Sequence, residues 1–425
     1  MKEEFLQYLW LNGNFDLNNL KTTKHEDIVL IKRGNLNTDS GPDFSHGELV
    51  LNNTKWVGSI EIHINSSEWY SHKHHKDKAY NNVILHVVYN HDKECYREDS
   101  SIIPCLELKD RINPSTLFSH NKLTQSLLAI PCQGVINKVS YISVSQMLER
   151  SLIERLEERF AAIREELESN KGNWQETFYR YLLKSFGFKT NSNAFHQLAT
   201  SLPLNIIAKH KDNNLQLEAL LYGQAGMLNK SYKDVYPLEL YKEYEFLKKK
   251  YGLKPMNLVQ WKFMRMRPAN FPTIRISQFA NLIHKSEHLF SKIIENKTAA
   301  GLFSFFDIRA SEYWNDHYKF DSASEKNSKK RLGKSGMENL IINTVVPFLF
   351  AYAKSKGDIS QQEQAINILL DINAENNKIT KQWKELNIHC NNAFESQAQI
   401  QLFNSYCTKK KCLDCGIGKQ ILQGS

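Results

Sequence analysis

The stretch GPDFSHGELVLNNTKWVGSIEIH, residues 41–63, alternates apolar and polar side chains on either side of a polar tetrapeptide. Residues 52–55, Asn-Asn-Thr-Lys, are typical of a turn, so the flanking segments are predicted to pair as an antiparallel hairpin. If the turn is centred near residue 53, paired positions sum to about 106. Asp43 is then expected opposite His63, and Ser45 opposite Glu61.

The second strand of this hairpin divides its side chains between two faces, because successive residues of a strand point in opposite directions. The isoleucines at positions 60, 62 and 64 take the core face, which leaves Glu61 and His63 together on the other. With Asp43 at the same end of the hairpin, this set suits Mg²⁺ or Mn²⁺ and a bound water. The alternative is that Glu61 and His63 face solvent on a half-exposed strand.

Strand-like patterns continue on both sides of the hairpin, and a helical spacing of apolar residues over positions 3–11 precedes them. The run at 83–88 is nearly all apolar, which is expected of a central strand covered on both faces. The segments predicted as strands are 28–31, 49–51, 57–64, 83–89 and 102–108.

The character of the chain becomes helical after Pro131, beginning with apolar residues at steps of three and four from Met147 to Leu167. The sequence therefore predicts an α+β protein, with a small mixed α/β domain over residues 1–135 and a mostly α-helical domain over residues 136–425. Further helical stretches are predicted at 174–187, 192–201, 214–228, 238–251, 276–297, 337–355, 360–372 and 393–406.

The composition is that of a soluble globular protein, because 41% of the 425 residues are hydrophobic and 24% are charged. The net charge of +9 favours an anionic partner such as nucleic acid. We see no export signal, and the richest apolar run, 340–352, is too short to cross a membrane. A cytoplasmic location without a membrane partner is therefore expected, whereas the oligomeric state is left open.

Three of the seven cysteines lie close together near the end of the chain. Cys407, Cys412 and Cys415 form a C-x4-C-x2-C pattern, and His389 or Cys390 is the expected fourth ligand of a zinc ion or an iron–sulfur cluster. The alternative is a group of reduced cysteines packed at the end of a helix. The lysines at 409–411 add a basic patch that could meet phosphate.

The order of elements in the first domain resembles the PD-(D/E)XK nuclease fold, on the residues Pro42-Asp43 and Glu61-Ile62-His63. This resemblance implies a restriction-endonuclease-like α/β domain in which Asp43 and Glu61 hold a divalent metal ion. It also implies that His63 occupies the position of a lysine that positions or activates the attacking water. Glu4 on the opening helix corresponds to an auxiliary acid that some members carry.

A histidine-rich segment connects the hairpin to the buried strand. In a nuclease-like core this segment borders the metal site, so His72, His74 and His75, with Asp77, could touch the scissile phosphate. They could instead form a separate transition-metal site with histidines 63 and 86, or belong to a solvated basic loop with lysines 73, 76 and 78. His86 itself is interpreted as a core histidine with one hydrogen-bond partner.

Nearly the whole chain also resembles an uncharacterised bacterial family of unknown function. The segments that carry this resemblance are NTDSGPDF, WVGSIEIHINSSEWYSHKHHKDKAYNNVILHVVY, RPANFPTIRISQFANLI, INTVVPFLFAYAK and YCTKKKCLDCGIG. The resemblance implies no activity.

The leading hypothesis is therefore a metal-dependent nuclease that hydrolyses phosphodiester bonds in DNA or RNA with Mg²⁺ or Mn²⁺. Asp43 and Glu61 would be ligands, and His63 a water-positioning base or third ligand. Two alternatives stay open. One is an inactive nuclease-fold module that binds nucleic acid or protein, and the other is a hydrolase that uses the histidines at 72–75 with zinc or manganese.

Overall fold

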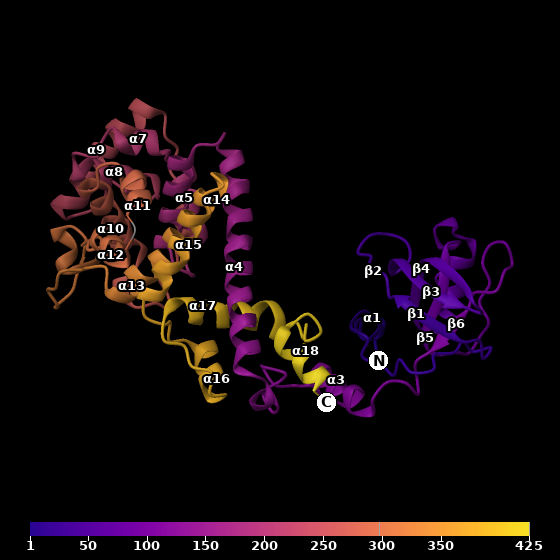
Figure 1. Ribbon diagram of the computed structural model, residues 1–425. Coiled ribbons are helices and arrows are strands. Elements are labelled where there is room, and N and C mark those ends of the chain that lie inside the picture. The colour runs from indigo at the N-terminus through magenta and orange to yellow at the C-terminus, as the bar shows by residue number, and fades with distance from the viewer. Residues whose placement is uncertain (297, 425) are drawn as a thin grey trace. The chain divides into compact units, whose positions relative to one another are not determined.

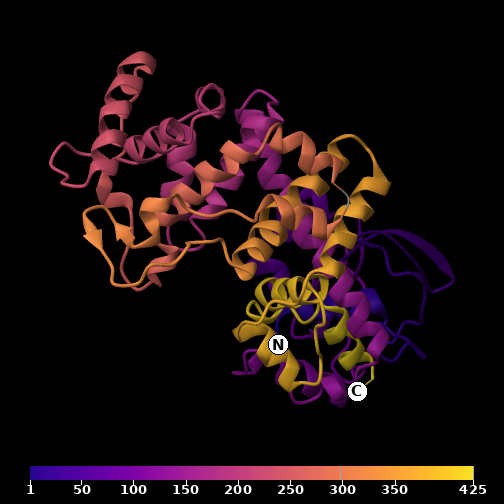
Figure 2. The ribbon, with the colours of Figure 1, turned by 90° about the vertical axis from the view of Figure 1, so that its left-hand side faces the viewer.

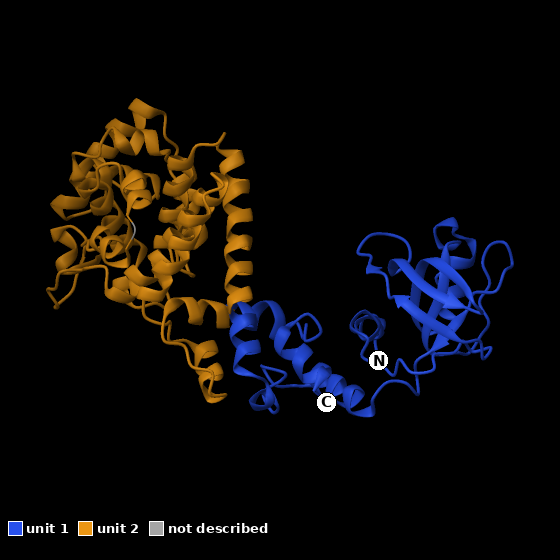
Figure 3. Ribbon diagram, in the orientation of Figure 1, with its two compact units in different colours: residues 1–148, 401–425 blue, residues 149–400 orange. Residues whose placement is uncertain are grey.

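The computed structural model describes residues 1–296 and 298–424, which form an α+β protein, as predicted. The chain divides into two compact units, shown in Figure 3. Unit 1 consists of residues 1–148 and 401–425, and unit 2 of residues 149–400. This division differs from the predicted boundary at residue 135, because residues 136–148 and the C-terminal segment from residue 401 belong to the sheet-containing unit.

Unit 1 contains a mixed sheet with short helices in its connections (Figure 1). The elements before the sheet is complete are α1 (Glu3–Asn12), β1 (Ile28–Lys32), β2 (Asn35–Leu36), β3 (Phe44–Leu51), β4 (Thr54–Asn65), α2 (Glu68–Ser71), η1 (His74–Lys76), η2 (Lys78–Tyr80), β5 (Val83–Asn90) and β6 (Cys105–Glu107). They are followed by α3 (Pro114–Gln125), η3 (Ile136–Lys138), the start of α4 (Tyr141–Ser169), the π-helical turn η9 (Phe403–Cys407) and α18 (Gly416–Gln423).

The sheet has the strand order β1-β3-β4-β5-β6, with β2 paired to β3. The first three strands of this order are antiparallel, whereas β4 pairs with β5, and β5 with β6, in parallel. Parallel neighbours need a crossover connection, which residues 66–82 supply through the short helices α2, η1 and η2. The first six residues of β5 are buried, as the apolar run at 83–88 predicts.

The hairpin between β3 and β4 forms, but its register differs from the predicted one. Gly47 pairs with Gly58 and Phe44 pairs with Ile60, so β3 contains one extra residue between these two pairs. This β-bulge includes His46, whose φ of 57° lies in the left-handed region. The pairs from Leu51–Thr54 to Gly47–Gly58 sum to 105, one less than predicted, and the bulge shifts the register by one more residue. Asp43 therefore lies beside Glu61, and its predicted pairing with His63 is wrong.

Helix α1 packs against β4 and closes one side of the site described below. Phe5, Leu6, Leu9 and Trp10 are fully buried, which explains why apolar residues recur at helical spacing in this segment. The helix ends at Gly13, whose φ of 67° suits the left-handed conformation common just after a helix. The polar residues of α1, such as Gln7, can therefore face the edge of the sheet.

Unit 2 is mostly helical, with one small hairpin seen as orange arrows at the left of Figure 2. The predicted stretch 276–297 is interrupted at residues 286–288, and its last residue lies outside the described residues. After α4, the elements are α5 (Trp174–Phe186), α6 (Ser192–Ser201), α7 (Leu204–Ala208), α8 (Asn214–Gln224), α9 (Val235–Tyr251), η4 (Leu258–Gln260), η5 (Pro268–Asn270), α10 (Pro272–Lys285), α11 (Leu289–Glu295), α12 (Ala299–Phe305), η6 (Glu312–Asn315), β7 (His317–Lys319), β8 (Ser322–Ala323), α13 (Lys334–Leu340), η7 (Ile341–Val345), α14 (Val346–Ser355), α15 (Ile359–Asn367), η8 (Ile368–Asp371), α16 (Lys378–Glu385) and α17 (Ala393–Leu402).

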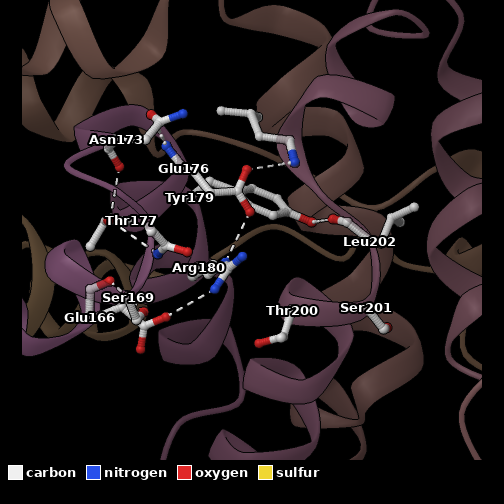
Figure 4. A network of polar contacts seen from close by, with 12 residues as sticks. Glu166, Ser169, Asn173, Glu176, Thr177, Tyr179, Arg180, Thr200, Ser201 and Leu202 are labelled. Atoms are coloured by element: carbon white, nitrogen blue, oxygen red, sulfur yellow. Dashed lines mark hydrogen bonds and ion pairs between the residues drawn. The ribbon is translucent and has the colours of Figure 1, made fainter.

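A polar network ties three of the helices of unit 2 together (Figure 4). Arg180 of α5 donates from Nε to Glu176 at 2.9 Å and from Nη1 to Glu166 of α4 at 3.3 Å. The neighbouring Tyr179 hydroxyl donates to the Leu202 carbonyl at the end of α6, at 2.7 Å. Because every polar atom in these contacts has a partner, the network stabilises the helix packing instead of providing a reactive group.

The helix from Lys334 to Ser355 is long and apolar enough to cross a membrane by length and composition. However, 61% of its most apolar window is buried inside the protein. Such burial is typical of the core helix of a soluble protein, so a soluble protein is compatible with this helix.

The close approach of β4 to β5 gives a test of the sheet. A Cβ at Gly58 would lie 2.5 Å from the Asn82 carbonyl oxygen and 2.5 Å from Cγ2 of Ile84. We expect Gly58→Ala to lower the free energy of unfolding by about 1–3 kcal/mol, because the backbone oxygen cannot move without separating the strands. Urea denaturation followed by circular dichroism measures this change. Gly134→Ala is the control, since a Cβ there meets no atom within 4 Å; equal stability of the two variants would contradict the packing.

Candidate functional site

Three polar side chains of the two central strands are buried on one face of the sheet. Glu61 and His63 are 4% and 1% exposed, so they do not lie on a solvent-exposed face of the strand. The parallel register pairs Glu61 with His86 of β5, which places the three side chains next to one another. Burial of a carboxylate and two imidazoles without partners would be costly, so their contacts define the site.

Asp43 and Glu61 clasp the open end of the hairpin through reciprocal contacts with the backbone. The backbone N–H of Asp43 donates to Oε2 of Glu61 at 3.0 Å, and the N–H of Ile62 donates to Oδ2 of Asp43 at 3.0 Å. Gln7 of α1 donates from its side chain to Oδ1 of Asp43 at 2.9 Å. These bonds fix both carboxylates, and they leave Oε1 of Glu61 facing the histidines.

Four side-chain atoms converge next to this clasp. Oε1 of Glu61 lies 3.3 Å from Nε2 of His74 and 3.6 Å from Nε2 of His63. Nε2 of His63 in turn lies 3.1 Å from Nδ1 of His72, and the ligand atoms of the three histidines all lie within 4.8 Å of one another. Ligands bound at 2.0–2.1 Å around a tetrahedral metal ion stand about 3.3 Å apart, so the three histidines, with Oε1 of Glu61 beside His63 and His74, suit a transition metal ion.

The second nitrogen of His63 contacts a buried partner, as is usual for an imidazole that binds metal. Nδ1 of His63 lies 2.8 Å from Nε2 of His86, which is fully buried. With the proton on Nδ1, His63 donates this hydrogen bond, and Nε2 presents its lone pair to the converging atoms. His86 thus makes one hydrogen bond, as the sequence suggested, and this bond positions His63.

The access to the site is through the histidine-rich connection. His72 is exposed, whereas His74 is partly buried and stacks on Tyr80 with ring centroids 3.8 Å apart. Trp69 closes the inner side with its ring 5.3 Å from His74 and 5.5 Å from His86. A substrate can therefore approach on the His72 side, where a metal ion held here could take water as a further ligand.

Burial and crowding of like charges shift several pKa values in the site. Burial, and then the neighbouring His86, His74 and His72, lower the pKa of His63 to about 2, so its imidazole is neutral at physiological pH. Burial and the Glu61 carboxylate raise the pKa of Asp43 to about 6. Neutral imidazole is the form that binds a metal ion, and a cation would relieve the crowding of the acids.

Two residues of α1, Glu3 and Gln7, complete the site, although the sequence-based prediction selected Glu4 on this helix. Burial, followed by the charges of Asp43 and Glu61, raises the pKa of Glu3 to about 7, whereas the proposed auxiliary acid Glu4 is exposed. Gln7 contacts Glu3 at 3.3 Å as well as Asp43. The spacing of four residues between positions 3 and 7, which places them on one face of a helix, was the available signal.

Two other members of the histidine-rich connection lie outside the converging group. His75 packs on Tyr70, with ring centroids 5.1 Å apart, and Asp77 accepts a hydrogen bond from the Ala79 backbone. The segment is therefore divided: its first two histidines, at 72 and 74, face the site, whereas His75 and Asp77 stabilise the turn.

The structure brings together the three cysteines of the C-terminal motif. Cys407, Cys412 and Cys415 are buried in unit 1 and interact electrostatically with Cys132. Cys390 belongs to unit 2, where its charged neighbours are a glutamate and a lysine. The sequence gave no reason to select Cys132, since 274 residues separate it from the C-x4-C-x2-C pattern.

A groove of about 850 Å³ lies beside α1 in unit 1. Its charged lining is mostly basic, with five lysines against Glu4 and Asp414. Gln7, which holds Asp43, also lines the groove. The groove therefore connects the basic C-terminal segment to the edge of the acidic site. The five lysines are Lys2, Lys409, Lys410, Lys411 and Lys419.

A comparison with known families identifies the family of the chain. The family model described as "Protein of unknown function (DUF2851)" matches residues 3–378, so the chain belongs to this family. The resemblance to a family of unknown function is thereby confirmed. Curated proteins and solved structures gave no match. The chemistry of the site is consequently argued from its residues alone.

The raised pKa of Glu3 predicts a pH-dependent stability in metal-free protein. The folded state takes up a proton on Glu3 between its ordinary pKa of 4.5 and about 7, so its contribution to stability falls as the pH rises through this window. Relative to wild type, Glu3→Gln should gain about 1 kcal/mol from pH 4.5 to 7, after allowance for solvent screening. Urea denaturation at several pH values measures this difference. Glu4→Gln is the control, and equal pH profiles for the two variants would contradict the assignment.

Proposed function

We propose that this member of the DUF2851 family hydrolyses phosphodiester bonds in nucleic acid with a metal ion held by Glu61, His63, His72 and His74. The observation that carries the proposal is the convergence of three imidazoles, whose ligand atoms lie within 4.8 Å of one another, with Oε1 of Glu61 3.3 Å from Nε2 of His74 and 3.6 Å from Nε2 of His63. Three imidazoles with one carboxylate suit zinc or manganese, whereas Mg²⁺ prefers oxygen ligands. The donor set therefore favours a transition metal ion over Mg²⁺.

The residues around the converging atoms have separate tasks in such a reaction. A metal ion bound here would polarise the phosphoryl oxygen and lower the pKa of a coordinated water. Glu61 keeps its orientation through the Asp43 backbone, and His63 through His86, so the ligand positions are preorganised. The carboxylates of Asp43 and Glu3 lie next to Glu61 and can accept the proton of the attacking water.

The order of elements supports a nuclease-like reading of the first unit. A helix, a strand preceded by Pro42-Asp43, a hairpin, a strand carrying Glu61-Ile62-His63, a connection and a buried strand follow one another as in the PD-(D/E)XK fold. His63 has a different task from the lysine of that family. Both of its ring nitrogens contact other side chains, so it acts as a metal ligand and leaves no nitrogen free to serve as a base.

Two further features favour an intracellular anionic polymer as substrate. The lysine-lined groove beside α1 matches the charge of a phosphate backbone, and the net charge of +9 has the same sign. The seven cysteines, all within the described part of the chain, form no disulfide bonds, which suits a reducing compartment. A cytoplasmic location is therefore part of the proposal.

Cleavage of labelled nucleic acid tests the proposed reaction. Purified protein with Zn²⁺ or Mn²⁺ should cut DNA or RNA, and His74→Gln should lower kcat/KM by more than about 100-fold because it removes a ligand. His75→Gln is the matched control: it changes the neighbouring histidine, which lies outside the converging group, and should retain activity. Isothermal titration of metal binding to the two variants measures the loss of the ligand directly.

Other outcomes separate this proposal from its alternatives. Nucleic-acid binding without cleavage, unchanged in His74→Gln, would indicate a non-catalytic binding module and overturn the hydrolase. Cleavage that is equally strong in His74→Gln and wild type would show that another site performs the reaction. Cleavage supported by Mg²⁺ alone, lost in Asp43→Ala but not in His74→Gln, would indicate that Asp43 and Glu61 hold the metal ion without the histidines.

The groove makes a separate prediction about salt dependence. Replacement of Lys409, Lys410 and Lys411 by alanine should weaken DNA binding equally across sequences and reduce the slope of log K against log salt by about 2–3. Fluorescence anisotropy at several salt concentrations measures the slope. The matched control replaces the three lysines of 248–250, at the end of α9 in unit 2. If the slope of log K against log salt changed in the 248–250 variant but not in the 409–411 variant, the DNA would contact unit 2 and not the groove.

A further inference from the structure

Four cysteines from distant parts of the sequence gather in unit 1. Cys132 follows α3, Cys407 ends the π-helical turn η9, and Cys412 and Cys415 lie in the turn before α18. All four are 8–9% exposed. Burial is common for a single cysteine, but four buried thiols at one place need a reason beyond packing.

These thiols form one group, since each interacts electrostatically with the other three. The fold brings their segments together: Cys132 lies between α3 and η3, and both of these contact α18, the helix that directly follows Cys415. A bound cation would stabilise these buried thiols as thiolate ligands.

We propose that Cys132, Cys407, Cys412 and Cys415 hold an iron–sulfur cluster, a site independent of the proposed hydrolase. The C-x4-C-x2-C spacing of the last three is the spacing of plant-type ferredoxins, whose fourth cysteine comes from elsewhere in the chain. Here that fourth cysteine is Cys132, which the fold supplies and the sequence pattern does not reveal.

The separation of the sulfurs favours a cluster over a single zinc ion. Zinc bonds of about 2.3 Å would bring four sulfurs to about 3.8 Å from one another. Within residues 1–296 and 298–424, the group of three or more ligand atoms that all lie within 4.8 Å of one another is the histidine group, not the cysteine group. A cluster places several irons and sulfides between its cysteines and therefore holds them further apart.

The backbone around the cysteines is shaped to enclose a bulky group. The chain reverses after Cys407 through Lys410, whose φ is 53° and whose N–H donates to the Cys407 carbonyl at 3.1 Å. Helix α18 then closes over Cys412: a Cβ at Gly418 would lie 2.1 Å from the Cys412 carbonyl oxygen. Only glycine permits this approach, so the turn and the helix are held in one arrangement.

The remaining cysteines are well suited as internal controls. Cys390 is half-buried in unit 2, with Glu395 and Lys384 as its charged neighbours. Cys95 and Cys105 are buried in unit 1 as deeply as the four proposed ligands. Burial alone therefore does not distinguish the proposed ligands from Cys95 and Cys105, whereas metal binding would.

Metal analysis of the full-length protein, purified anaerobically, tests the cluster. We expect a brown protein that contains iron and acid-labile sulfide in equal amounts, at about two or about four of each per chain. After reduction with dithionite, electron paramagnetic resonance should show a cluster signal. A colourless protein without iron, or one that contains about one zinc ion and no iron, would overturn the proposal.

Cysteine reactivity identifies the ligands, even if a variant fails to fold. In native wild-type protein, treatment with an iron chelator should make the four proposed ligands reactive towards iodoacetamide together, while Cys95 and Cys105 stay protected; mass spectrometry locates the labels. Cys132→Ser should lose most of the iron, whereas Cys390→Ser should retain it. Full iron content in Cys132→Ser, or loss of iron in Cys390→Ser, would overturn the assignment of the fourth ligand.

Discussion

The burial of the Glu61 carboxylate is the constraint on which the rest of the first unit depends. A carboxylate that is 4% exposed must be compensated, and its two oxygens are used differently. Oε2 accepts the backbone N–H of Asp43, which fixes the end of the hairpin, while Oε1 faces the imidazoles of His63 and His74. The same residue therefore joins the strand pairing to the arrangement of the candidate metal ligands.

The side chains packed around Glu61 also follow from the need to compensate its buried carboxylate. His86 on the neighbouring parallel strand contacts the inner nitrogen of His63, and Trp69 and Tyr80 cover the imidazole of His74. On the other side α1 contributes Gln7, which contacts Asp43. These contacts bury Glu61 and His63, and the exposed His72 leaves one side of the site open. Such an arrangement strengthens charge interactions with a bound metal ion while keeping the site accessible.

Unit 1 is also closed by the C-terminal segment, which returns to it after unit 2. This segment carries the lysines 409–411 of the groove, and three of the four buried cysteines flank these lysines in sequence. A cluster at the cysteines would therefore hold the basic residues beside α1. In this way a group with no part in hydrolysis can shape the surface that a phosphate backbone would contact.

The sequence by itself determined the α+β class, the hairpin, the buried strand and the identity of Glu61, His63, His72 and His74 as candidates, because alternation and residue chemistry are local properties. Only the tertiary structure decided that Asp43 lies beside Glu61, since the two-residue turn at Asn52 and Asn53 and the bulge at His46 each shift the predicted register by one residue. It also placed Glu3 near Asp43 and brought Cys132 to the three C-terminal cysteines. These choices depend on contacts between residues far apart in the chain, which no local pattern encodes.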